Sequence, residues 1–228
     1  MGMFVRTESA SHSFNPACRL WVVACALTLL GAALPLVAAH AEDPAATPLP
    51  TVERFHTALL TAMKDADKLG YDGRRSLLEP VIDGTMDLPF MAEKAAGKFW
   101  KEFSETDRAR WVSAFRNNTV ANYAGRFNRY SGQSFVIHGE EPSPFDTILV
   151  KTTLKDPGGE DVQLNYRMKK GSSGWRIIDI FMHGTVSELA LRRAEYSSAL
   201  ERDGLDKVIQ NLEGQAAKLS SGADTAAH

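Results

Sequence analysis

The chain has 228 residues, of which 44% are hydrophobic and 24% are charged, and its formal net charge is −2 at pH 7. This length is enough for one domain with a sizeable core. The nearly balanced charge gives no electrostatic reason to expect nucleic acid or a strongly anionic membrane surface as a partner.

The first residues have the pattern of a secretory signal. Arg19 precedes the apolar stretch LWVVACALTLLGAALPLVA, which leads into a small-residue exit, Ala-His-Ala, at 39–41. A positive charge, an apolar centre and such an exit predict a cleaved signal peptide over residues 1–41. An uncleaved N-terminal anchor is the alternative, because Leu20 to Val37 is nearly long enough to span a bilayer. The proline in this stretch and the small-residue exit favour cleavage.

Cleavage after the exit would remove both cysteines, Cys18 and Cys25. The mature protein would then have no disulfide, no thiolate nucleophile and no cysteine metal site. Its stability would have to come from its core alone. No later segment is apolar enough to cross a membrane, so we expect an exported single domain.

Helical periodicity dominates the first half of the mature chain. A leader at 42–50 shows no periodicity. After it, apolar residues recur at helical spacing and predict a first helix at about 51–68. The residues of this row are Val52, Phe55, Leu59 and Met63.

Two shorter helices are predicted next, at 74–84 and 88–100, and Asp87 is placed to cap the start of the second. Ser104 with Asp107 then resembles a capping box and opens a long helix that reaches about Tyr130. The apolar row of this helix drifts slowly around its axis. Its members are Trp111, Phe115, Thr119, Tyr123 and Phe127.

Strand patterns follow, and short glycine-containing turns connect the last three of them. The four predicted strands lie at 133–138, 147–155, 161–170 and 174–182. Strands joined by short turns form an antiparallel meander with one face covered.

Helical patterns return after the predicted strands, at 186–204 and 205–214, and a small polar tail at 214–228 is expected to be flexible. The predicted fold class is therefore α+β: a helical layer packed on a curled four-stranded antiparallel sheet, with C-terminal helices. We expect this fold to form one domain at 51–213.

Side chains suited to catalysis are few in residues 42–228. No two histidines have metal-ligand spacing, and no glycine loop could hold a phosphate. Asp179 alone interrupts an apolar strand with a charge. Two interpretations are possible: a buried general acid with a raised pKa, or a carboxylate that pairs with arginine or tyrosine at the sheet rim. The second interpretation is favoured, and the sequence predicts no catalytic set, no metal site and no cofactor.

Bulky apolar residues are abundant instead, on both the helices and the strands. Those singled out are Trp100, Trp111, Phe115, Tyr123, Phe127, Leu164, Tyr166, Met168, Trp175 and Ile177. Periodicity does not distinguish a filled core from a lined cavity, so both interpretations stay open for these residues.

A series of short motifs runs through residues 50–213 in a recognisable order. In the helical half they are Met86-Asp87, Gly97-Lys98-Phe99-Trp100, Ser104–Asp107, Trp111–Phe115 and Tyr123 to Tyr130; in the closing hairpin they are Tyr166-Arg167, Gly174-Trp175, Asp179 and Gly184–Ser187. This ordered set resembles the MlaC family of periplasmic phospholipid-binding proteins, also called the toluene-tolerance auxiliary family. Met86 stands where the family usually has Phe, and the run after Ser187 differs from the usual one. The chain is in this respect similar to the hopanoid-associated HpnM branch.

The resemblance implies a cavity between the helical layer and the sheet that holds the tails of a phospholipid or a hopanoid. It implies that the bulky apolar residues singled out above bind lipid, and it places Arg167 at the cavity mouth beside Tyr166. It further implies a monomeric periplasmic carrier, not an enzyme. The implied partners are an inner-membrane ABC transporter complex and an outer-membrane or RND-type lipid component.

Two other functions remain open from the sequence. One is a small exported hydrolase or isomerase that uses Asp179, which would require an acid–base pair in a pocket. The other is a non-catalytic interaction module with a solid core. A solid core would favour the interaction module, and an activity that Asp179→Asn abolishes while lipid binding stays intact would favour the enzyme.

Overall fold

The computed structural model describes residues 46–221. The predicted signal peptide at 1–41, the first part of the leader and the last residues of the predicted tail lie outside this range. Within it, none of the helices combines the length and the hydropathy that a membrane span requires.

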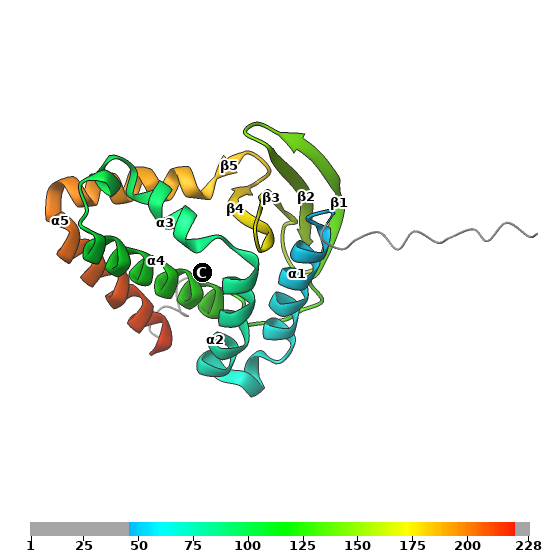
Figure 1. The fold of residues 1–228 in the computed structure, drawn as a ribbon. Helices are drawn as coiled ribbons and strands as arrows, with labels where there is room; N and C mark the ends of the chain where they lie inside the picture. Colours follow the sequence, from blue (N-terminus) through cyan, green and yellow to red (C-terminus); the bar gives the residue numbers. More distant parts are fainter. Residues whose placement is uncertain (1–45, 222–228) are drawn as a thin grey trace, which may run out of the picture. The chain divides into compact units, whose positions relative to one another are not determined.

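The elements follow the order that the sequence predicts: helices first, then strands, then helix (Figure 1). The helices are α1 (Leu49–Lys64), α2 (Ala66–Thr85), α3 (Leu88–Ala96), the 3-10 helix η1 (Gly97–Lys101), α4 (Glu105–Arg126) and α5 (Glu188–Ser220). The strands are β1 (Ser134–Ser143), β2 (Thr147–Lys155), β3 (Val162–Gly171), β4 (Gly174–Met182) and β5 (Val186–Ser187). The α+β class is confirmed.

Side-chain caps set the starts of two helices in the way the sequence indicates. The Asp87 carboxylate accepts a hydrogen bond from the backbone N–H of Phe90 at 3.1 Å, which fixes the first turn of α3. Ser104 accepts from the backbone N–H of Asp107 at 3.1 Å and begins α4. The helix ends at Arg126, earlier than the predicted Tyr130.

The sheet has five strands in the order β1-β2-β3-β4-β5, all neighbours antiparallel. The prediction of four strands is corrected by β5, whose two residues pair with Phe181 and Met182. A two-residue strand has no detectable period, and Ser187 also caps α5 by accepting from the backbone N–H of Ala190 at 2.9 Å. The helix pattern therefore masks the strand in the sequence.

The C-terminal helix extends past the predicted domain end at 213. It bends at Gly204 (φ 76°, ψ 169°), at the junction of the two predicted helices, in a backbone region almost restricted to glycine. Its last turns lie close to α4: a Cβ built on Gly125 would sit 2.8 Å from the Leu219 side chain. Residues 214–220 are thus helical, and a small residue on α4 permits this close approach.

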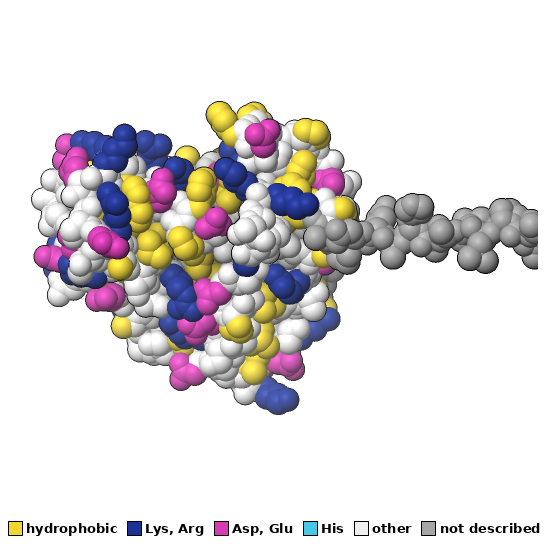
Figure 2. All heavy atoms as spheres, in the orientation of Figure 1, with side chains coloured by type: hydrophobic (Ala, Val, Ile, Leu, Met, Phe, Trp, Pro, Cys, Tyr) yellow, Lys and Arg dark blue, Asp and Glu magenta, His cyan; other side chains and the backbone are white. Residues whose placement is uncertain are grey.

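The helices and the sheet form two layers with the core between them. α4 packs against α2, α3 and α5, while the junction of α2 and α3 is tied to β4 by the backbone N–H of Asp87, which donates to the carbonyl of Ile177 at 2.9 Å. On the face shown in Figure 2, acidic and basic side chains are interleaved over the helices, with apolar groups between them.

Candidate functional site: a partly open apolar cavity

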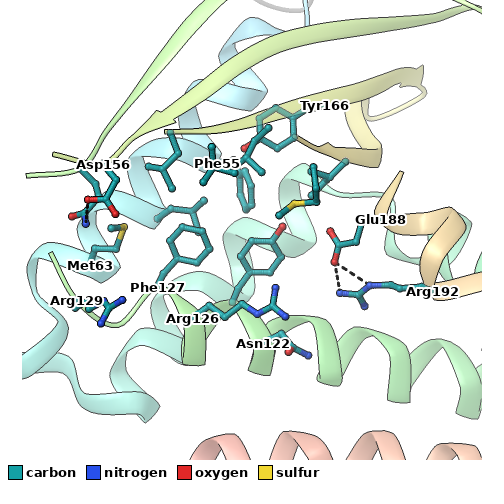
Figure 3. A pocket seen from close by; sticks show the side chains of 18 residues that line it. Phe55, Met63, Asn122, Arg126, Phe127, Arg129, Asp156, Tyr166, Glu188 and Arg192 are labelled. Atoms are coloured by element: carbon teal, nitrogen blue, oxygen red, sulfur yellow. Dashed lines mark hydrogen bonds and ion pairs between the residues drawn. The ribbon is translucent and has the colours of Figure 1, made fainter. Parts of the chain in front are cut away.

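A cavity of about 290 Å³ lies between α1, the C-terminal half of α4, the sheet and the start of α5. Figure 3 shows that its walls come from both layers of the fold. This volume is at the lower end of the range for ligand pockets, roughly 300–1,000 Å³.

Most of the cavity wall is apolar. Three of the four residues in the apolar row of α1 line the cavity, all but Val52, and strands β2, β3 and β4 supply the opposite side. The apolar lining consists of Phe55, Leu59, Met63, Phe127, Leu154, Val162, Leu164, Ile180 and Met182. Such a wall offers no hydrogen bonds, which suits an aliphatic guest.

One ion pair lies at the edge of the cavity near the start of α5. Arg192 donates to the carboxylate of Glu188 at 2.7 Å, and the two side chains are largely shielded from solvent. Burial is the largest single influence and disfavours the Arg192 cation, but Glu188 and two nearby tyrosines together outweigh it, so the pKa of Arg192 is raised. Arg192 therefore stays charged at neutral pH, and its charge is balanced by its ion-pair partner Glu188.

Two tyrosines of the lining stay neutral at physiological pH. Burial raises the pKa of Tyr123 and of Tyr166 above the ordinary value for a phenol. The Tyr166 hydroxyl lies 3.0 Å from Nε2 of His56, a buried residue whose ring stacks on Phe135. Burial lowers the pKa of His56 to about 4, so this histidine is also neutral at pH 7.

The structure brings some of the predicted lipid-binding residues to the cavity and not others. Tyr123, Phe127, Leu164 and Tyr166 line it. Trp111, Phe115, Met168 and Ile177 are fully buried in the solid core instead. That these or any other residues bind lipid stays a prediction.

Helix geometry explains why some aromatic residues of α4 lie in the solid core and others line the cavity. With 3.6 residues per turn, each step of four residues advances about 40°, so Phe127 points about 160° away from Trp111. Trp111 accordingly faces α3, where its indole N–H donates to the carbonyl of Ala92 at 2.8 Å, and its ring meets Tyr196 of α5 edge-on at 5.4 Å. Phe127 stacks on Tyr123 at 5.7 Å, on the cavity side.

The remaining predicted residues lie elsewhere. Trp100 is half-buried in η1, with the Arg108 guanidinium 5.2 Å from the centre of its ring. Trp175 is half-buried at the start of β4, where its carbonyl accepts from Thr51 at 3.3 Å. Neither side chain lines the cavity.

Arg167 is placed away from the cavity mouth that the resemblance assigned to it. Side chains alternate along a strand, so Leu164 and Tyr166 face the cavity while Arg167 points to the other face of the sheet. There its guanidinium lies 4.9 Å from the ring centre of Phe181. The arginines that do line the cavity are Arg126, Arg129 and Arg192.

Asp179 has a structural role that neither sequence interpretation anticipated. Its carboxylate accepts from the Ser187 hydroxyl at 2.7 Å and from the backbone N–H of Leu189 at 3.1 Å. It therefore holds the first turn of α5 against β4. Arg167 stands opposite it in the register but forms no ion pair with it within residues 46–221.

Sequence reasoning missed two parts of the site. The α1 row of Phe55, Leu59 and Met63 was visible as a helical pattern, but the pattern does not say what the row faces. Arg126 and Arg129 flank Phe127, the last residue of the apolar row of α4, and that position was the only available signal. Among the described residues, no group of three or more histidine, cysteine, aspartate or glutamate side chains could hold a metal ion.

The fold and the cavity together define a class of protein: an α+β domain with an apolar, partly open interior between its two layers. Residues 53–214 match the MlaC protein family model, and the chain belongs to that family. The predicted family is thus confirmed, while the finer assignment to the hopanoid-associated branch stays a prediction.

A solved structure supports the same fold. It is the structure of a phospholipid-binding protein from Ralstonia solanacearum, determined in complex with a phospholipid. The two chains are similar with a TM-score of 0.65 and 21% sequence identity, over 78% of this chain and 99% of that one. At this identity the likeness shows a shared fold.

Proposed function

We propose that this protein is a periplasmic carrier that holds the apolar tails of a lipid in the cavity between its helices and its sheet. The lipid is a phospholipid, and the carrier shuttles it between membrane components of an ABC-type lipid transport system. Membership of the MlaC family supports this proposal, as does the phospholipid bound to the Ralstonia protein of the same fold.

The observation that carries the proposal is the hollow, apolar region beside a solid core. A chain of some sixteen methylenes gains roughly 0.8 kcal/mol for each one removed from water, on the order of 13 kcal/mol in all. A carrier in an aqueous compartment must supply a comparably dry environment. The wall formed by α1, α4 and three strands supplies it, and the partly open side leaves a place for the head group.

The enzyme alternative depends on Asp179, and the position and contacts of this residue do not support a catalytic role. The Asp179 carboxylate lies outside the cavity lining and is engaged by Ser187 and by the backbone of α5. The interaction module with a solid core is disfavoured by the cavity itself. Neither alternative is supported by a specific feature of the described residues.

The test is native mass spectrometry of the protein purified from the periplasm, followed by organic extraction of the bound material. We expect a mass increment that matches a phospholipid, and the same lipid in the extract. Protein that carries no amphiphile, and that takes none up from mixed micelles, would contradict the carrier function.

A further inference from the structure

Most polar groups that line the cavity already have partners within the protein. Asn122 donates to the carbonyl of Asn118 at 2.8 Å, so its amide is turned toward its own helix. Gln133 donates to the carboxylate of Asp156 at 3.0 Å, and the same carboxylate oxygen accepts from the backbone N–H of Gly158. These groups are held in place by the fold and are not left open for a ligand.

Two charged side chains differ from this pattern. Arg126 and Arg129 line the cavity, are exposed, and form no hydrogen bond or ion pair within residues 46–221. Figure 3 shows them on either side of Phe127, at the end of α4. Their guanidinium donors are thus available beside an apolar wall.

The charge of the lining favours an anion at this place. Glu188 is neutralised by Arg192, which leaves Arg126 and Arg129 against the single carboxylate of Asp156. The C-terminal end of a helix by itself repels anions, because its free carbonyls carry partial negative charge. The two arginines reverse that tendency at the end of α4.

We propose that Arg126 and Arg129 bind the phosphate of the head group at the cavity mouth and thereby select phosphate-bearing lipids over uncharged lipids with the same tails. This inference rests on the proposed carrier function, because it needs a lipid in the cavity. Guanidinium groups present forked donors that match phosphate oxygens. A tail held in the cavity keeps the head group at a high effective concentration, so that even exposed contacts add to affinity. An uncharged hopanoid would leave both arginines unused.

The experiment compares two lipids with identical acyl chains, phosphatidic acid and diacylglycerol, bound by delipidated protein and quantified by native mass spectrometry. The wild-type protein should prefer phosphatidic acid by about tenfold, the range expected for a charge-assisted hydrogen bond. The double variant Arg126→Gln/Arg129→Gln should lose this preference and keep its affinity for diacylglycerol. Arg193→Gln is the matched control, since Arg193 is exposed on α5, outside the cavity lining.

The outcomes separate this inference from the function on which it rests. Equal binding of both lipids by wild type and variant would overturn the phosphate site and leave the carrier intact. An equal loss of preference in Arg193→Gln would also overturn it, because the effect would then come from overall charge. Binding of neither lipid would overturn the carrier function. Inorganic phosphate is tested alone: we expect no measurable binding without a tail, and phosphate binding in the absence of lipid binding would contradict both proposals.

Discussion

The two halves of α4 contain similar aromatic residues in different surroundings. In the N-terminal half, Trp111 and Phe115 are fully buried, and α3 and α5 both close upon them. In the C-terminal half, Tyr123 and Phe127 are half-buried and border open space that α1 and the sheet do not fill. The same residue types thus build a solid core in one place and a cavity wall in the other. What decides between them is the element that lies opposite.

The largest expected difference between the halves is in stability after truncation. Trp111→Ala should lower the free energy of unfolding by about 3–5 kcal/mol, because it leaves a cavity in a packed core and removes a buried hydrogen bond. Phe127→Ala should cost only about 1–2 kcal/mol, since the side chain is half-buried and already borders open space. Urea denaturation of both variants measures the difference. Equal losses would show that the two regions are packed alike.

A second test uses pH and concerns His56 of α1, whose ring contacts Tyr166 and Phe135 of the sheet. The pKa of His56 is about 4 in the folded protein and about 6.5 in the unfolded chain. Between these values the unfolded chain binds a proton that the folded protein excludes, so stability decreases as the pH falls from 6.5 to 4. The expected loss is on the order of 3 kcal/mol.

The control for this pH effect is His56→Gln, which keeps a hydrogen-bonding group near Tyr166 but does not titrate. Urea denaturation at several pH values should show a shallower pH dependence for the variant. A wild-type protein whose stability does not change more than that of the variant in this window would contradict the buried, neutral His56.

The smallest expected stability effect comes from placing a tryptophan at a position in the solid core and, in a separate variant, at a position in the cavity wall. Ile177→Trp overpacks the solid core and should cost about 1–3 kcal/mol. Leu164→Trp projects into open space, so it should cost less and instead reduce the amount of lipid bound. Thermal unfolding and the extracted lipid per protein are measured on both variants. The reverse order, with Leu164→Trp the more destabilising and lipid loading unchanged, would argue for a filled interior.

The order and type of the elements followed from local patterns in the sequence. The α1 row at helical spacing, the caps at Asp87 and Ser104, and the alternation along β3 each depend on neighbours within a few residues. The fifth strand was missed because Val186 and Ser187 are too few to show a period. The two C-terminal helices predicted on either side of Gly204 correspond to the two segments of α5, which meet at the bend at this glycine.

The site was harder to predict than the fold. Tyr123, Phe127, Leu164 and Tyr166 were in the predicted set because they are large and apolar, and Trp111 and Ile177 were there for the same reason. Arg167 was placed at the mouth by a motif, while the register of β3 turns it to the other face. Arg126 and Arg129 were not singled out, because an exposed arginine has no local signature that reports what lies across from it.

The sequence by itself determined the family, the α+β order and the apolar faces, since these depend on residue type and spacing along the chain. Only the tertiary structure decided which of those faces meet and which enclose space. Packing density depends on the distance between elements that are far apart in sequence, here α1, the end of α4 and the sheet. No periodicity within one element reports that distance.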